Sequence, residues 1–248
     1  MTSGTVNAEG GVFLHGKLAV VTGATRGIGA AIAMRLRNMG ARVLATGRDP
    51  AGRAPEGCDY HGVDLSDDAS TQRFAGYLGQ VKPDVLVNNA GINRLAPIAE
   101  TEPETVAALH RVNVLAPMIL TRAVLPAMRE RKWGRIVNVA SIWSLRSIPG
   151  RAAYSASKFG LDGLTSAIAA EVAADNVLVN CVSPGFVGTE LLRRMMSEAQ
   201  IAELVAQVPM KRLARPEEIA AFVGWLAGPE NTYISGQNLP IDGGYTKT

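Results

Sequence analysis

The stretch KLAVVTGATRGIG, residues 17–29, decides the fold. Residues 17–22 form a short apolar run, which predicts a strand buried on both faces, as in a parallel sheet. A Gly-rich turn follows directly, residues 30–39 then have the composition of a helix, and residues 42–46 form a second apolar run. This order of strand, turn, helix and strand is the opening unit of a dinucleotide-binding fold.

The turn carries glycine at positions 23, 27 and 29, a different spacing from the usual G-x-G-x-x-G. Glycines let the backbone approach a pyrophosphate closely, and a helix N-terminus places positive partial charge beside it. Because the turn lies between an apolar strand and a helix, we predict a nucleotide site here.

The rest of the chain alternates in the same way. Further strands are predicted at residues 58–63, 83–88, 135–140, 177–182 and 237–241, and helices at 67–80, 102–131, 151–171, 189–207 and 216–227. No linker or repeat interrupts the pattern. It predicts one α/β domain over residues 17–248, a Rossmann-type doubly wound parallel sheet of about seven strands with helices on both faces, after a loose extension at 1–16.

Three local details accompany this assignment. Ser66 is expected to cap the helix at 67–80. Pro117 is expected to kink the long stretch at 102–131, and Pro126 falls near its end. The segment between Gly47 and Cys58 is too short for a connecting helix, which predicts an open end of the cofactor cleft.

The pair Tyr154 and Lys158 is the main candidate for chemistry. On a helix the two side chains share a face, one turn apart. A lysine ammonium favours the phenolate and lowers the tyrosine pKa, which makes an acid/base group for neutral pH. The alternative is that Tyr154 and Lys158 form a solvated pair on the protein surface. The other motifs of the chain have to distinguish a catalytic pair from a surface pair.

The unusual motifs fall where predicted strands end. They are residues 23–29, Asp64, residues 88–91, Ser141 and residues 184–185. In doubly wound sheets ligands bind beyond the carboxyl ends of the strands, so these positions predict one shared site.

These motifs resemble those of the short-chain dehydrogenase/reductase family. The resemblance rests on TGATRGIG at 22–29, NNAG at 88–91, a serine thirteen residues before the YxxxK tyrosine, and the PG at 184–185. RLARPEEI at 212–219 and DGG at 242–244 are similar to the subgroup of 3-oxoacyl carrier-protein reductases and sugar and alcohol dehydrogenases. The family implies a homotetramer.

The resemblance implies four catalytic roles. Tyr154 would be the general acid/base, and Lys158 would hold the nicotinamide ribose and lower the tyrosine pKa. Ser141 would hydrogen-bond the substrate carbonyl. Asn113 would anchor a water that feeds a proton relay through Lys158. Hydride would pass between the nicotinamide and the substrate carbon.

The second strand bears on the choice of cofactor. NAD-binding folds usually place an acid at its end, where this chain has Gly47 followed by Arg48. Gly47 would leave room for a 2′-phosphate, and Arg48, with Arg26, could pair with it. We therefore predict that the chain prefers NADP(H) to NAD(H). The neighbouring Asp49 argues against this preference, because an acid at the end of this strand could bind the ribose 2′-hydroxyl of NAD(H).

The remaining cofactor contacts follow from the turn and from the family. The full predicted set is Gly23, Thr25, Arg26, Gly27, Ile28, Gly29, Arg48, Asp64, Leu65, Asn89, Ala90, Gly91, Tyr154, Lys158, Pro184, Gly185, Val187 and Thr189. Asp64 would accept from the adenine amino group; a turn residue is the alternative.

The substrate pocket is the least determined region. The candidates are Ser141, Trp143, Arg146 and Phe186. Arg94, Arg146 and Arg151 could recognise an anionic group, although each could equally be a surface arginine. In a carrier-protein reductase a basic residue is expected near the position of Asp175, so this acid makes a carrier-protein substrate less favoured. Arg131 and Lys132 are still basic residues that could meet an acidic carrier.

Composition bounds the partners and the compartment. The chain has 248 residues, is 47% hydrophobic and 19% charged, and carries a net charge of +3 without a basic run, which disfavours nucleic-acid binding. Two cysteines are expected to be free thiols in a reducing compartment. With no secretory signal and no apolar run of membrane-spanning length expected, we predict a cytoplasmic protein that binds no membrane. The three histidines are isolated, so no metal is expected.

The first hypothesis is thus an oxidoreductase that transfers hydride between NADP(H) and a carbonyl or secondary-alcohol substrate, a small molecule. Alternatives are a 3-oxoacyl thioester reductase, an NAD-dependent sugar or polyol dehydrogenase, and a catalytically idle nucleotide-binding sensor or scaffold. Such idle members usually lack one of the four catalytic residues, all of which are present here.

Overall fold

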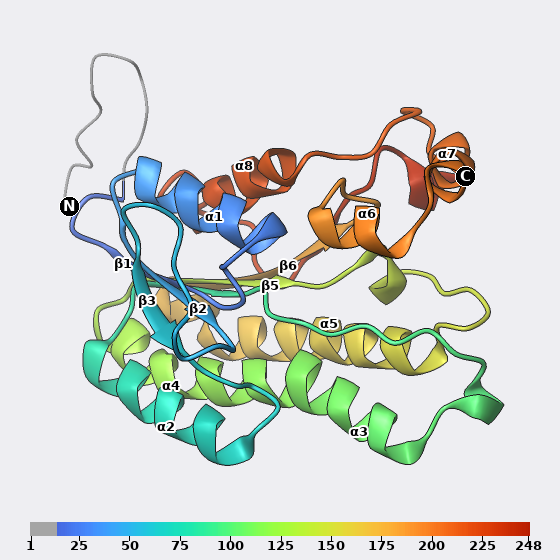
Figure 1. Ribbon diagram of the computed structural model, residues 1–248. Helices are drawn as coiled ribbons and strands as arrows, with labels where there is room; N and C mark the ends of the chain where they lie inside the picture. Colours follow the sequence, from blue (N-terminus) through green and yellow to red (C-terminus); the bar gives the residue numbers. More distant parts are fainter. Residues whose placement is uncertain (1–13) are drawn as a thin grey trace.

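The computed structural model describes residues 14–248, so most of the extension expected at 1–16 lies outside the described residues (Figure 1). One parallel sheet of seven strands forms the centre of the described part, in the order β3-β2-β1-β4-β5-β6-β7. The strands are β1 Leu18–Val21, β2 Arg42–Gly47, β3 Asp59–Gly62, β4 Val85–Asn88, β5 Gly134–Val139, β6 Val177–Pro184 and β7 Asn238–Ile241. The predicted doubly wound α/β fold is confirmed.

Helices cover both faces of this sheet (Figure 1). One face is covered by α1 (Gly27–Asn38) and α8 (Pro216–Ala227), the other by α2 (Asp68–Val81), α4 (Ala116–Glu130) and α5 (Ala152–Val172). The shorter helices are α3 (Pro103–His110), α6 (Glu190–Met195) and α7 (Glu198–Gln207). No helix separates β2 from β3, as expected from the short segment between them.

Two hydrophobic clusters lie on the two faces because side chains alternate along a strand. On β1, Ala19 and Val21 belong to the cluster shared with α1 and α8. Val20 belongs to the cluster that contains Phe74 of α2 and Leu120 of α4. This two-sided burial is why residues 17–22 form a continuous apolar run rather than an alternating one.

The cap of α2 differs from the prediction. Asp67, not Ser66, is the N-cap, and its carboxylate accepts from the backbone N–H groups of Ala69 (3.1 Å) and Ser70 (3.2 Å). Ser66 instead donates its hydroxyl to Asp64 Oδ1 at 2.6 Å. An aspartate caps as well as a serine, so the sequence alone left the two neighbours equivalent.

The long helical stretch at 102–131 is divided by a π-helical turn, residues 111–115, between α3 and α4. Pro117 lies in the first turn of α4, directly after the π-helical turn, and the predicted kink there stays a prediction. Pro126 lies inside α4, in the last part of the helix before it ends at Glu130, as expected. Likewise residues 189–207 form two helices, because Ser197 makes a capping box with Gln200 that begins α7.

By length and mean hydropathy (1.2), one described stretch, Pro103–Glu130, could cross a membrane, contrary to the expectation that no run is long enough. In the fold it is a core helix: Leu120, Val124 and Met128 are fully buried against the sheet. Core helices of this length pass the same test, so the stretch is weak support for a membrane span.

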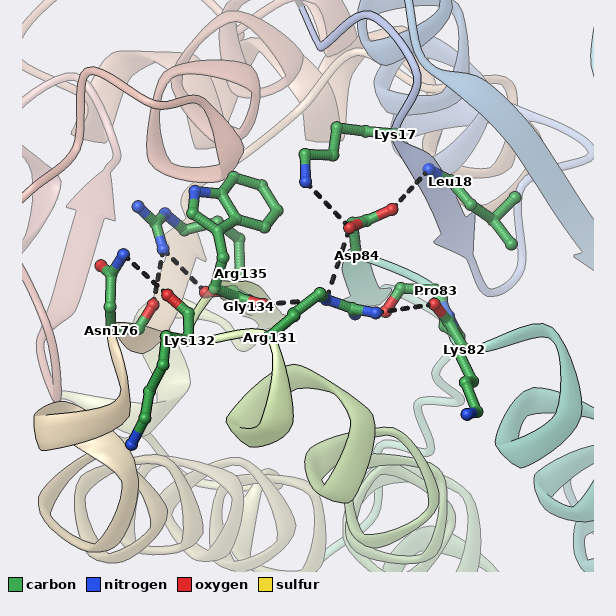
Figure 2. Close-up of polar contacts among 11 residues, drawn as sticks. Lys17, Leu18, Lys82, Pro83, Asp84, Arg131, Lys132, Gly134, Arg135 and Asn176 are labelled. Carbon is green, nitrogen blue, oxygen red and sulfur yellow. Dashed lines mark hydrogen bonds and ion pairs between the residues drawn. The ribbon is translucent and has the colours of Figure 1, made fainter. Parts of the chain in front are cut away.

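Figure 2 shows polar contacts at the amino end of the sheet, the edge opposite the predicted site. Asp84 accepts from Lys17 Nζ (3.1 Å) and from the Leu18 N–H (2.9 Å), which ties β1 to the start of β4. The buried Arg135 donates to the carbonyl oxygens of Gly134 (2.8 Å) and Asn176 (3.0 Å), and burial lowers its pKa to about 10. The contacts of Asp84 and Arg135 connect elements at the amino end of the sheet and do not belong to the predicted site.

Candidate active site

The Gly-rich turn packs directly on the turn that follows β4. Gly23 has φ +63°, and a Cβ there would lie 2.9 Å from Ala90 Cα. A Cβ on Gly29 would collide with the Gly23 carbonyl oxygen and the Asn89 side chain. Glycine is therefore required at both positions, by close approach of the two turns as well as by any ligand.

Thr22 holds the two turns together, and sequence reasoning missed it. Its hydroxyl oxygen accepts from the backbone N–H groups of Asn89 and Ala90, both at 3.0 Å. Asn89 Nδ2 in turn donates to the carbonyl oxygens of Thr22 (2.9 Å) and Gly23 (3.0 Å). Its place at the end of β1, immediately before the first glycine, was the available signal.

The first turn of α1 fits a pyrophosphate. Arg26 is its N-cap without a side-chain cap hydrogen bond, and the turn has no acidic residue. Its leading backbone N–H groups thus have no intrahelical acceptor. Thr189 lies across from it, because a Cβ on Gly27 would be 3.5 Å from Thr189 Cγ2. On the far side, a Cβ on Gly185 would be 2.8 Å from Asp242 Cα.

Gly47 has a packing role that the sequence analysis did not predict. It is buried, and a Cβ would lie 2.6 Å from Thr25 Cγ2 and 2.8 Å from the Tyr60 hydroxyl. The glycine therefore admits these two side chains, and the room expected for a 2′-phosphate stays a prediction. The sequence does not show that the side chains of Thr25 and Tyr60 pack beside Gly47.

The two arginines expected near a 2′-phosphate are both exposed, and neither forms an ion pair within the described residues. Arg48 is close enough to Asp64 to lower its pKa. Asp49, the objection to NADP(H), uses Oδ1 to accept from the Ala51 N–H at 2.9 Å. The acid is thus engaged in its own turn while Arg26 and Arg48 stay available.

Asp64 is a turn residue in the structure. Its Oδ1 accepts from the Ser66 N–H (2.9 Å) and hydroxyl (2.6 Å), and these hydrogen bonds lower the pKa of the carboxyl. The predicted contact with adenine stays a prediction.

Lys158 and Tyr154 share a face of α5, as predicted. Lys158 is 4% exposed, its Nζ donates to the Val139 carbonyl oxygen at 2.9 Å, and it lies 5.9 Å from the centroid of the Tyr154 ring. Burial lowers the pKa of Lys158 to about 8. The ammonium is thus fixed at the carboxyl end of β5.

The predicted effect of Lys158 on Tyr154 was wrong for this structure. The pKa of Tyr154 is raised, chiefly by burial, and the opposing influences are a hydrogen bond with the Ser141 side chain and the Arg151 guanidinium. Desolvation of the phenolate outweighs the attraction of nearby cations, and Lys158 directs its ammonium at a carbonyl oxygen.

Ser141 follows β5 immediately and is mostly buried. Its hydroxyl oxygen accepts from the Trp143 N–H at 3.3 Å, which caps the short turn at 142–144. The Ser141 side chain also counteracts the rise in the pKa of Tyr154, so the two hydroxyl groups lie near each other, as a site for one carbonyl oxygen requires.

Asn113 lies in the π-helical turn and is fully buried. Its Oδ1 accepts from the Ile92 N–H (2.9 Å), and its Nδ2 donates to the Ile92 carbonyl (3.0 Å) and to Ser157 Oγ (3.0 Å). Ser157 then donates its hydroxyl to the Tyr154 carbonyl at 2.7 Å. Ser157, missed in the sequence, thus joins Asn113 to the Tyr154 turn; it sits inside the YxxxK motif but has no spacing signal of its own.

Gly91 marks where these groups meet. A Cβ there would lie 3.2 Å from Asn113 Oδ1 and 3.5 Å from Lys158 Nζ. Since Ala90 contacts Gly23, the predicted catalytic residues adjoin the Gly-rich turn.

Three aromatic rings line the other side of Tyr154. The ring centroids of Trp143 and Phe186 are 6.4 Å apart, and Tyr245 lies 6.1 Å from the first and 4.9 Å from the second. Sequence reasoning missed Tyr245 because it is distant in the chain. Arg146 donates to the carbonyl oxygens of Tyr245 (3.5 Å) and Thr248 (3.2 Å), so it fastens the last segment instead of facing the pocket.

Comparison with known proteins identifies the family of this chain. A model described as enoyl-(acyl carrier protein) reductase matches residues 23–246. The chain belongs to the short-chain dehydrogenase/reductase family. It is an NAD(P)-dependent oxidoreductase that acts on CH–OH or C=O groups, as the resemblance implied.

Relatives in this family have several substrates. A 3-oxoacyl-[acyl-carrier-protein] reductase of Pseudomonas aeruginosa is 38% identical over 93% of this chain and 98% of its own length. A 3-oxoacyl (acyl-carrier-protein) reductase of Agrobacterium tumefaciens C58 with NADP bound is 32% identical, with a TM-score of 0.87 over 94% of this chain and 95% of that one. A gluconate 5-dehydrogenase of Burkholderia cenocepacia J2315 in complex with NADP and tartrate is 29% identical, with a TM-score of 0.86 over 95% and 97%.

Proposed function

We propose that this chain transfers hydride between NADP(H) and a carbonyl or secondary-alcohol group of a small molecule, with Tyr154 as the general acid/base. The observation that carries the proposal is the placement of Tyr154 and Lys158 on one face of α5, with the Lys158 ammonium at the Val139 carbonyl oxygen, beside the Gly-rich turn and near Ser141.

The nicotinamide supplies the hydride when it is bound. In reduction Tyr154 gives its proton to the carbonyl oxygen, and its raised pKa keeps that proton in place at neutral pH. Ser141 orients the same oxygen by a hydrogen bond. Lys158, held at the Val139 carbonyl oxygen on the same helix face as Tyr154, would hold the nicotinamide ribose.

Asn113 supports this arrangement through its side chain. Both of its amide N–H donors are engaged, by the Ile92 carbonyl and by Ser157. A relay water, if held by Asn113 as the family implies, is therefore assigned in this proposal to its main-chain carbonyl in the π-helical turn. There the regular i→i−4 pattern of hydrogen bonds is interrupted.

The preference for NADP(H) is supported by charge. Arg26 and Arg48 have no ion-pair partner in the described part of the chain, whereas the nearby acid, Asp49, is held by the Ala51 N–H. Two similar structures have NADP bound. NAD(H) remains the second cofactor of this proposal.

A 3-oxoacyl thioester reductase is the second candidate function, favoured by the similarity to carrier-protein reductases. The basic residues available for an acidic carrier are occupied here. Arg129 Nε pairs with Asp175 at 2.6 Å, and Lys132 pairs with the same carboxylate. Arg131 donates to the carbonyl oxygens of Lys82 and Pro83 (Figure 2). We therefore favour a small substrate over one carried by a protein.

The proposed assembly is a homotetramer in the cytoplasm. Helices α4 and α5 border an apolar groove of about 550 Å³, whose lining includes Met118, Leu125, Leu164 and Ile168. Large apolar side chains nearby are exposed, Phe159 at 45% and Met118 at 43%. A second copy of the chain is the proposed occupant, which would remove this surface from water.

The test is Tyr154→Phe, which removes the proton and keeps the ring. We expect turnover to fall by roughly 10²- to 10⁴-fold, the usual contribution of general acid/base catalysis, with NADPH affinity within about threefold of wild type. Tyr233→Phe is the matched control, because Tyr233 is 97% exposed. The readouts are NADPH oxidation with a ketone panel and NADPH fluorescence for binding.

Near-normal turnover in Tyr154→Phe would rule out this acid/base. Wild-type protein that binds NADPH but reduces no ketone, thioester or sugar would favour the sensor or scaffold hypothesis.

A further inference from the structure

Arg94, Arg146 and Arg151 were predicted as candidates to recognise an anionic group. Their contacts in the structure differ. Arg146 is occupied by the carbonyl oxygens of Tyr245 and Thr248. Arg94 is exposed and donates to the adjacent Asn93 carbonyl at 3.2 Å. Arg151 has neither a side-chain hydrogen bond nor an ion pair with any described residue, although it is half-buried. An unpaired cation in that setting is costly unless something else compensates it.

Arg151 is held by an aromatic ring. Its guanidinium carbon lies 4.6 Å from the centroid of Trp143, a ring that also faces Phe186 and Tyr245. A guanidinium over an aromatic face keeps its N–H donors free at its edges, which suits bidentate binding of an oxyanion. Trp143 therefore orients the cation without using its hydrogen-bonding capacity.

The position of Arg151 is next to the chemistry. It is the N-cap of α5, three residues before Tyr154, and it lies over Trp143, whose hydrophobic cluster Tyr154 packs against. The first turn of α5 contains no acidic residue. A negative group bound by Arg151 would therefore lie within the same pocket as the reacting carbonyl.

The nearby acids do not neutralise Arg151. Asp242 accepts from the backbone N–H groups of Gly244 (2.9 Å) and Thr246 (2.7 Å). Glu100 and Glu102 line a cavity of about 140 Å³ with Arg94 and Ala153, and neither forms an ion pair with Arg151. Within residues 14–248, no carboxylate lies within 4.0 Å of the Arg151 guanidinium.

We infer that Arg151 is a specificity-determining residue that binds an anionic oxygen group of the substrate, a carboxylate or a phosphate, while the carbonyl faces Tyr154 and Ser141. The preferred substrates are thus oxo or hydroxy compounds that carry an acid, rather than neutral ketones or thioesters. This inference rests on the proposed function and specifies the substrate class of the same site.

The experiment uses matched pairs of acid and neutral ketones with NADPH. The probes are acetoacetate against ethyl acetoacetate, and dihydroxyacetone phosphate against dihydroxyacetone, so that the two arms distinguish carboxylate from phosphate. Wild type, Arg151→Gln and Arg151→Lys are compared, with Arg94→Gln as the matched control. We expect wild type to favour the acid of at least one pair by about tenfold or more in kcat/KM.

In Arg151→Gln we expect KM for that acid to rise by roughly 10- to 100-fold, the usual loss of a charge-assisted hydrogen bond, with the neutral ketone and the NADPH Kd changed by less than about threefold. Arg151→Lys should retain part of the preference, and Arg94→Gln all of it.

Equal loss for acid and neutral ketone in Arg151→Gln would show that the residue only packs on Trp143, and would overturn the inference. A wild type that prefers the neutral member of both pairs would overturn it as well, while leaving the proposed function intact. If no carbonyl of any kind is reduced, the proposed function fails and this inference fails with it.

Discussion

At the scale of single residues, burial decides the electrostatics of the site more than neighbouring charge does. Tyr154 and Lys158 both move toward their neutral forms, since desolvation penalises the phenolate and the ammonium alike. Tyr154 is thereby kept as a proton donor for reduction. Of these two groups, Lys158 titrates nearer to neutral pH.

The pH dependence of ketone reduction should therefore follow Lys158. Because its pKa is about 8, we expect kcat to decline with a midpoint near pH 8 as the ammonium is lost, while Tyr154 is still protonated. The pKa of Lys158 in the folded protein, about 8, lies below its value of 10.5 in the unfolded chain. Between these pH values the folded protein binds fewer protons than the unfolded chain, so the contribution of Lys158 to the free energy of unfolding increases as the pH rises. Circular dichroism should hence show an intact fold across the decline. A rate that stays flat to pH 10 would contradict the assignment.

Cofactor choice is a second prediction at this scale. Arg48→Asp should lower kcat/KM for NADPH by roughly 10- to 100-fold, because a charge-assisted contact is replaced by repulsion, and leave NADH nearly unchanged. Steady-state rates with both cofactors measure it. Arg53→Asp makes the same charge change in the same loop and should have little effect. An unaltered NADPH to NADH ratio in Arg48→Asp means that Arg48 does not read the 2′-phosphate.

At the scale of secondary-structure elements, two helix glycines have opposite roles. Gly29 of α1 faces the Gly23 carbonyl and Asn89, whereas a Cβ on Gly76 of α2 meets nothing within 4 Å. The first glycine is needed by the contact between two turns. The second only lowers helix propensity.

Alanine substitution should separate these roles. Gly29→Ala should lower the free energy of unfolding by about 1–3 kcal/mol through overpacking and weaken NADPH binding. Gly76→Ala should raise it by about 0.5–1 kcal/mol with activity unchanged. Urea unfolding measures both. If Gly29→Ala proves as stable as wild type, the close approach of the two turns is not a constraint.

At the scale of the whole molecule, the α4 and α5 face is the proposed contact between copies. Met118→Asp would place a charge in the apolar groove, and we expect the tetramer to dissociate to smaller species by light scattering at micromolar concentration. Gln72→Asp, on the exposed side of α2, adds a comparable charge elsewhere and should leave the mass unchanged. A tetramer that survives Met118→Asp, or a wild type that is monomeric, would argue against this interface.

The sequence by itself determined the sheet and the Gly-rich turn, and its motifs predicted Ser141, Tyr154 and Lys158 as catalytic residues, whereas Asn113 was predicted from the family resemblance alone. These depend on local periodicity and on short motifs that a chain carries whether or not it is folded.

Only the tertiary structure decided the sign of the Tyr154 pKa shift, the bridge through Ser157, the packing role of Gly47, and which arginine of the pocket is unpaired. Each depends on how deeply a group is buried and on partners far away in sequence, as Tyr245 is from Trp143. Desolvation and long-range contact arise only when the chain folds, and no spacing rule encodes them.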